Sequence, residues 1–150
     1  MTNKLFVDYE NAILEVLKLK EIPESSLLKP IQEGKWSVRE IIGHLFYWDK
    51  FILDHLVPHI TNNAVLPPFP DFDLHNQDAI KYIERYNSVV SLIDEFSQTR
   101  KQVIEKMFGI KNNIKFTIGT DNFTKDSFIT VFIEHDTHHF KQIWDHLSLE

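Results

Sequence analysis

The stretch from Phe128 to Leu147, FITVFIEHDTHHFKQIWDHL, decides the fold that the sequence predicts. Its large apolar residues recur at steps that place them on one face of an amphipathic helix. This stripe consists of Phe128, Phe132, Ile143 and Leu147. His135 and His139 occupy the positions that complete the stripe. Both imidazoles are therefore expected to point into the interior of the protein.

Two imidazoles in a protein interior need partners, because burying a polar nitrogen unpaired costs about 1–3 kcal/mol. Two histidines four residues apart on a helix can also present their nitrogens to one metal ion. The spacing alone is weak evidence, since His55 and His59 share it around Pro58, which should end a helix there. The phase within an apolar stripe distinguishes His135 and His139 from that second pair. The residues alone leave two interpretations open, a metal site and histidines that are satisfied in the core or at the surface.

The composition is that of a globular protein, and the 150 residues are enough for a single domain spanning 1–150. The net charge of −6, with both signs mixed along the chain, argues against a nucleic-acid partner. The absence of cysteine excludes disulfides and thiolate–zinc sites. No apolar run is long enough to span a bilayer, and the N-terminal segment carries carboxylates within an amphipathic pattern. We therefore expect a cytoplasmic protein without a membrane partner.

Four amphipathic segments predict an all-α protein, a four-helix bundle. They cover about residues 4–20, 37–57, 76–108 and 124–147, and the low glycine content agrees with this class. The start of the second helix is the clearest, because Ser37 and Glu40 have the spacing of a capping box. Thr124 is expected to cap the fourth helix, and a short helical turn is expected near residues 25–28.

The connections around the third helix differ in character. Residues 57–77 contain four prolines and predict a long link without regular structure. Such a link can carry the chain back along the bundle, so the second and third helices need not be antiparallel. Residues 114–118 alternate polar and apolar side chains before a turn-like segment, which predicts a short hairpin or extended loop before the fourth helix. Residues of 57–77 and 110–123 are expected to line any pocket at the histidines.

The final helix motif HDTHHFKQI (residues 135–143) and the segment WSVREIIGHLFYWD (residues 36–49) resemble the DinB/YfiT-like family of metalloenzymes in the DinB superfamily. The resemblance covers essentially the whole chain, including the long second connection. It implies that the metal ligands are His44 on the second helix and both ends of the H-x-x-x-H motif, His135 and His139. Members often have glycine before the glutamine of this motif, whereas this chain has Lys141, which should alter only the helix surface.

Three neutral imidazoles leave at least one coordination position open, which is the catalytic pattern for zinc. Zinc or nickel is the expected ion, with iron and manganese as alternatives. Such a centre can lower the pKa of a bound water to about 7 for hydrolysis, or it can hold an exogenous thiol as its thiolate. The family includes bacillithiol and mycothiol S-transferases and a mycothiol-dependent maleylpyruvate isomerase. The resemblance therefore implies transfer of a low-molecular-weight thiol to a small electrophile.

Two other functions are kept as alternatives, a metal-dependent hydrolase and a non-catalytic metal-binding or dimerising bundle. A small-molecule substrate is the expected partner, and a homodimer is a further expectation because relatives often dimerise. A hydrolase would need a general base beside the water. The nearest carboxylates, Asp49, Glu134 and Asp136, do not share a helix face with the histidines, although Asp136 or Glu134 could accept a hydrogen bond from a ligand imidazole.

Three more side chains are candidates for a pocket at the histidines: Trp48, Arg100 and His138. Trp48 is expected mainly in the core. Arg100 falls on or beside the apolar stripe of the third helix, so we expect an edge residue with its guanidinium in solvent, the alternative being an anion contact in the pocket. His138 lies about 100° around the helix from His139 and is expected at its edge. His75 and His146 are expected to be solvated.

Overall fold

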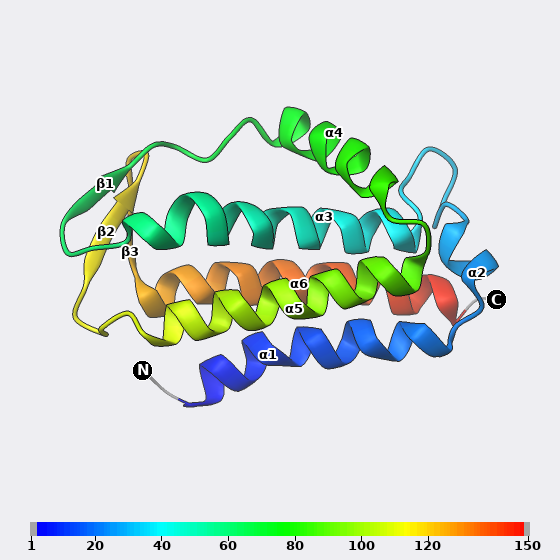
Figure 1. Cartoon of the computed structure of the whole chain (residues 1–150), viewed down its shortest axis with the longest axis horizontal. Coiled ribbons are helices and arrows are strands. Elements are labelled where there is room, and N and C mark those ends of the chain that lie inside the picture. The colour runs from blue at the N-terminus through cyan, green and yellow to red at the C-terminus, as the bar shows by residue number, and fades with distance from the viewer. Residues whose placement is uncertain (1–2, 149–150) are drawn as a thin grey trace.

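A computed structural model describes residues 3–148 (Figure 1). Four long helices run side by side: α1 (Asn3–Lys18), α3 (Val38–Phe51), α5 (Val89–Phe108) and α6 (Lys125–Leu147). They form the predicted four-helix bundle, to which two shorter helices and a small sheet are added. Helices α1 and α6 run in one direction, and α3 and α5 run in the other. The second and third long helices are therefore parallel, which the long connection permits.

The helix starts follow from local capping. The Ser37 side chain accepts a hydrogen bond from the backbone of Glu40, whose carboxylate accepts one from the backbone of Ser37, so the predicted capping box is present. Thr124 caps α6 in the same way with Ser127. The expected short turn near residues 25–28 is α2 (Glu24–Leu28), which follows a 3-10 turn at Leu19–Glu21.

The prediction of one helix over residues 76–108, preceded by an unstructured link, is wrong. Helix α4 (Phe72–Tyr82) begins inside the supposed link, where the Asp71 side chain accepts a hydrogen bond from the backbone of Leu74. A 3-10 turn at Ile83–Arg85 ends it, and a third capping box at Ser88 starts α5. Helix α4 lies over α3 (Figure 1), and this places its residues against the bundle at the level of His44.

The rest of the link also has regular structure. Helix α3 continues through a π-helical turn (Ile52–Leu56) and a 3-10 turn (Val57–His59), after which β1 (Ala64–Leu66) pairs in parallel with β2 (Lys115–Ile118). Strand β2 pairs antiparallel with β3 (Asp121–Thr124), so the predicted hairpin is confirmed. Gly119 in its turn has a φ of +61°, and a Cβ there would lie 3.1 Å from Cβ of Pro68. The sheet covers one end of the bundle (Figure 1, left).

The core consists of two apolar clusters with polar side chains between them. Along α5, Phe96 belongs to the first cluster and Val103 to the second, and Arg100 lies between these two. Along α3 and the π-helical turn that continues it, Asp49 likewise separates Phe46 from Ile52. The histidines and their neighbours belong to this polar layer, which therefore crosses the middle of the bundle. Within residues 3–148, no helix is long and apolar enough to cross a membrane.

Candidate metal centre

The imidazoles of His44 on α3 and of His135 and His139 on α6 converge on one point. Nε2 of His135 lies 2.9 Å from Nε2 of His44 and 3.2 Å from Nε2 of His139. One nitrogen of each ring lies within 4.8 Å of the others, although 91 positions separate His44 from His135. The expected convergence of the three residues is therefore present in the structure.

Hydrogen bonds determine which nitrogen of two of these rings carries the hydrogen. Nδ1 of His44 donates to the side-chain oxygen of Asn76 at 2.9 Å, and Nδ1 of His139 donates to that of Gln142 at 2.8 Å. Because an amide oxygen only accepts, both rings present a lone pair at Nε2. A neutral His135 carries one ring hydrogen. Even if this hydrogen is on Nε2, it can be donated to Nε2 of His44 or to Nε2 of His139 but not to both. At least one of these two lone pairs therefore faces Nε2 of His135 without a hydrogen between the two nitrogens.

A shared cation would satisfy these lone pairs, and the donor set fits a divalent transition metal. Zinc bound tetrahedrally at about 2.0–2.1 Å from imidazole nitrogens holds them about 3.3–3.4 Å apart. Two of the three separations, 2.9 and 3.2 Å, are slightly shorter than this, and all three lie within 4.8 Å, so rotations of the rings would bring the nitrogens to that spacing. The arrangement of two amide oxygens behind two imidazoles is also typical of metal sites, in which the second ring nitrogen is hydrogen-bonded.

The electrostatic environment keeps these imidazoles neutral at neutral pH. Burial lowers the pKa of His44 to about 4, and the neighbouring His139 acts in the same direction. Burial lowers the pKa of His135 to about 3, with further contributions from His139 and His44. The pKa of His139 is also lowered, again mainly by burial. Neutral imidazole is the form that binds a metal ion, so the cluster is ready for binding without prior loss of a proton.

A cavity of about 310 Å³ opens onto two of the three histidines, His44 and His135. Its other walls come from α3, from α4 and the chain just before it, and from α6: Trp48, Phe69, Phe72, Asn76, Val131 and Phe132. The link 57–77 thus contributes lining residues, as expected, whereas none of the lining residues comes from 110–123. Trp48 is both a buried core residue and part of the cavity wall.

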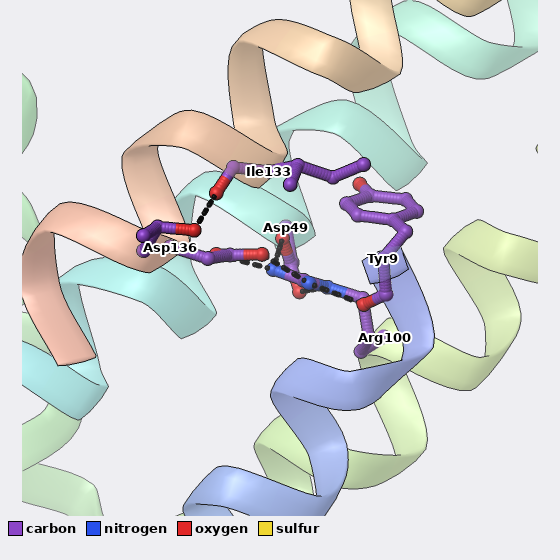
Figure 2. A network of polar contacts seen from close by, with 6 residues as sticks. Tyr9, Asp49, Arg100, Ile133 and Asp136 are labelled. Atoms are coloured by element: carbon purple, nitrogen blue, oxygen red, sulfur yellow. Dashed lines mark hydrogen bonds and ion pairs between the residues drawn. The ribbon is translucent and has the colours of Figure 1, made fainter. Parts of the chain in front are cut away.

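Arg100 lies in the core beside the cluster, and the prediction of an exposed guanidinium is wrong. Its side chain is 1% exposed, and Figure 2 shows it between Asp49 and Asp136. Nε and Nη2 donate to the two oxygens of Asp49 at 2.6 and 3.1 Å, and Nη1 and Nη2 donate to Asp136 at 2.8 and 3.1 Å. Nη1 also donates to the backbone oxygen of Tyr9 at 3.1 Å. All five N–H groups of the guanidinium are therefore engaged.

This network assigns the two nearest carboxylates a structural task. Asp49 and Asp136 face Arg100, so neither orients an imidazole, and the suggestion of Asp136 as such an acceptor is wrong. Glu134, the other suggested acceptor, is exposed. Burial raises the pKa of Asp49 to about 6 against the opposing effect of Arg100, so Asp49 is mostly ionised at pH 7. Burial would lower the pKa of Arg100, but Asp136 and Asp49 raise it above its usual value.

Other histidines lie outside the cluster. His138 is exposed on α6 and does not line the cavity, as expected for an edge residue. The prediction of a solvated His75 is wrong, because α4 carries it against α3, where it is 6% exposed and its ring centroid lies 4.0 Å from that of Trp48. His146, also expected to be solvated, is half-buried in the last turn of α6.

Two residues of the site, Asn76 and Gln142, were not predicted from the sequence. Gln142 stands in the quoted motif three residues after His139, a spacing at which helical side chains meet, so a signal for its contact existed. Asn76 has no comparable local signal, because its partner His44 is 32 positions away.

Fold and site together define a four-helix bundle protein with a candidate three-histidine metal centre. A family model described as the DinB superfamily matches residues 9–143, and the chain belongs to this superfamily. The structure is similar to that of YfiT from Bacillus subtilis, with a TM-score of 0.73 and 13% sequence identity over 97% of this chain and 87% of that chain. YfiT is described as a probable metal-dependent hydrolase with an unusual four-helix bundle topology. No curated protein matches the sequence significantly.

Proposed function

We propose that this protein is a metal-dependent enzyme that transfers a low-molecular-weight thiol to a small electrophile. In this proposal His44, His135 and His139 hold a divalent transition metal, zinc or nickel. The observation that carries the proposal is the convergence of three neutral imidazoles, of which two present lone pairs to the same point. The cluster lies at a cavity that a small molecule can enter.

A divalent metal bound there would supply Lewis acidity and an open position at which a thiol is held as its thiolate. The protein contributes orientation and an apolar wall. Asn76 and Gln142 keep two imidazoles in the tautomer that binds a cation. Trp48 and Phe132 form an apolar wall beside the cluster, and a substrate that fills the cavity would displace water from it, which would strengthen electrostatic interactions inside it.

The absence of a carboxylate from the cavity favours thiol transfer over hydrolysis. Among the residues that line the cavity there is no Asp or Glu, and the nearby Asp49 and Asp136 are both engaged by Arg100. Attack by a thiolate needs no positioned base once the thiol proton has passed to solvent. The sulfur then forms a bond to the electrophilic carbon, and the leaving group departs with the electron pair of the broken bond.

Hydrolysis is the second candidate, and the fold similarity to YfiT is the observation that favours it. Metal-activated water can act as a nucleophile near neutral pH, so a carboxylate base is helpful but not essential. The cavity would hold the substrate in the same place in either reaction. Only the identity of the nucleophile, a thiolate or a water, distinguishes the two proposals.

Metal content tests the part of the proposal that both reactions share. Protein purified without an affinity tag should contain a near-stoichiometric amount of transition metal by elemental analysis. His44→Ala should lose this metal, whereas His138→Ala, which removes an exposed imidazole from the same helix as His135 and His139, should retain it. A wild-type protein without metal, or a His44→Ala variant that retains it, would contradict the proposal.

The nucleophile can be identified with cobalt-loaded protein. A thiolate bound to Co²⁺ gives a charge-transfer absorption in the near ultraviolet. N-acetylcysteine should produce it, while N-acetylserine, which has a hydroxyl in place of the thiol, should not. If N-acetylcysteine has no effect, and the wild type hydrolyses p-nitrophenyl esters with a rate that His44→Ala abolishes and His138→Ala preserves, hydrolysis replaces thiol transfer as the function.

A further inference from the structure

We propose that the cavity beside the three histidines selects an uncharged aromatic molecule of one or two rings. The inference deepens the proposed function, because it treats this cavity as the place where the small electrophile lies. Recognition of the aromatic body, however, depends on the cavity walls alone. It can therefore be tested in the presence or absence of a metal ion.

The walls of the cavity are aromatic and uncharged. Besides the imidazoles of His44 and His135, four aromatic side chains line it, those of Trp48, Phe69, Phe72 and Phe132, and none of its lining residues is Lys, Arg, Asp or Glu. Arg100 is a cation of the polar layer, and its donors are all taken by Asp49, Asp136 and the backbone of Tyr9. In the metal-free protein, an ionised ligand would lose hydration here without gaining a counter-charge from the walls, which is costly.

Most of the few polar atoms in the walls are already engaged. The oxygen of Asn76 accepts the hydrogen of His44 Nδ1, and Nε2 of both His44 and His135 points into the histidine cluster. Apart from the amide N–H groups of Asn76, the cavity therefore offers a ligand ring faces and ring edges in place of hydrogen bonds. Its polar end is the cluster itself, where the reacting group of a substrate would lie.

The aromatic walls have a geometry that can accept another ring. Trp48 meets Phe69 at a centroid distance of 6.0 Å and Phe72 at 5.8 Å, with interplanar angles of 73° and 76°. These are edge-to-face contacts, an arrangement that aromatic rings favour because the positive ring edge meets the negative face. A ligand ring placed in the cavity could continue the same pattern.

Two apolar side chains at the cavity are exposed to water. Phe72 on α4 is 62% exposed, and Val131 on α6 is 47% exposed. Because these residues lie on the elements that border the cavity, an apolar ligand would remove part of their surface from water. Their exposure is a cost that a bound aromatic molecule would relieve.

The cavity volume sets the size of the ligand. An engineered apolar cavity of about 150 Å³ holds one benzene molecule. The volume here is about 310 Å³, roughly twice as large. It therefore suits one ring with substituents, or two fused rings, and is small for a bulky cofactor.

Calorimetric titration with two probes of matched shape tests this selection. At pH 7, 2-naphthol is uncharged and 2-naphthoate carries one negative charge. The full-length protein should be titrated after removal of metal by a chelator, so that the carboxylate cannot bind through an ion, and again after loading with zinc. In the metal-free protein, 2-naphthol should bind at least tenfold more tightly than 2-naphthoate. Equal affinities, tighter binding of 2-naphthoate, or no binding of either probe would overturn the inference.

Substitutions locate the bound probe. Phe72→Ala should weaken binding of 2-naphthol several-fold, whereas Phe108→Ala should not, although Phe108 is similarly exposed at 65% and lies outside the cavity. Val131→Lys should shift the preference towards 2-naphthoate, and Thr130→Lys, at the neighbouring exposed position outside the cavity, should leave it unchanged. Unchanged binding in both Phe72→Ala and Val131→Lys would overturn the inference. Because the titrations need no metal, they separate this inference from the proposed function.

Discussion

Nε2 of His44 lies 2.9 Å from Nε2 of His135, although the two residues are 91 positions apart in the chain. The helices that carry them are also joined by Arg100, which binds Asp49 of α3 and Asp136 of α6. Asp136 directly follows His135, and Asp49 is the fifth residue after His44. The same polar layer therefore holds α3 and α6 together and positions the three imidazoles between them.

Removal of the guanidinium should destabilise the fold strongly. Arg100→Met leaves the carboxylates of Asp49 and Asp136 buried without a counter-charge, which is expected to lower the free energy of unfolding by about 3–5 kcal/mol. Urea denaturation measures this change. Lys101→Met, at the neighbouring exposed position, is the matched control and should change stability by less than about 0.5 kcal/mol.

The cause of that loss can be tested separately. If unpaired charge is responsible, Arg100→Met combined with Asp49→Leu and Asp136→Leu should be more stable than Arg100→Met alone, because no buried charge remains. A triple variant that is as unstable as the single variant would show that packing or backbone contacts, and not charge, explain the role of Arg100.

The amides behind the imidazoles should control metal affinity. Asn76→Leu or Gln142→Leu removes the acceptor that holds Nδ1–H of His44 or His139, so each is expected to weaken metal binding about 10–100-fold. Competition with a chromophoric chelator measures the affinity. Gln77→Leu changes an exposed amide next to Asn76 and should bind metal like the wild type. Wild-type affinity in both Asn76→Leu and Gln142→Leu would show that these hydrogen bonds do not support the site.

Local signals account for what the sequence predicts correctly. Ser37 and Glu40 meet within one helical turn, so their capping box can be recognised without knowledge of the fold. His135 and His139 show their burial through their phase in an apolar stripe. The break between α4 and α5 was not predicted, because the apolar spacing continues through residues 83–90 and favours one helix. The Ser88 capping box was the signal that marked the break.

Contacts between distant segments explain what the sequence does not predict. Arg100 meets Asp49 across 51 positions and Asp136 across 36, so its own helix shows only a charged residue beside an apolar stripe. His75 is buried because α4 lies over α3, and that placement depends on the path of the link. The prediction of His44 as a metal ligand came from the family resemblance. Its position on the second helix indicated only that it lies at the margin of an apolar face.

Acid should release the metal at a lower pH than ordinary histidine would suggest. An unperturbed imidazole, with a pKa near 6.5, would begin to lose a metal below about pH 6. Burial lowers the pKa of His44 to about 4 and that of His135 to about 3, so protons compete with the metal only at lower pH. We expect the metal to remain bound at about pH 5.5 and to be released towards pH 4. Release that is complete by pH 6 would contradict this account.

The stability of the metal-free protein should fall with acid over the same range. Because the pKa of His44 is about 4 in the folded state and near 6.5 when unfolded, the unfolded chain binds more protons between these values. The free energy of unfolding should therefore decrease as pH falls from 6.5 to 4, by up to about 1.4 kcal/mol per pH unit for each such histidine. His44→Leu should make the dependence shallower, and an unchanged slope would contradict the lowered pKa.

Asp49 contributes to the pH dependence of the free energy of unfolding with the opposite sign. Its pKa is about 6 in the folded state against 3.8 as its ordinary value, so its contribution is fully present below pH 3.8 and is lost as pH rises through 6. The total pH dependence should therefore be smaller than the histidines alone would give. Comparing the slopes of the wild type and His44→Leu isolates the histidine contribution, because Asp49 is common to both.

The location of a bound metal tests the central claim most directly. Crystals of the zinc-loaded protein, measured at the zinc absorption edge, should show an anomalous peak between α3 and α6. The account predicts this peak at about 2.0–2.1 Å from Nε2 of each of His44, His135 and His139. A peak elsewhere on the molecule, or a position beyond bonding reach of His44, would contradict it.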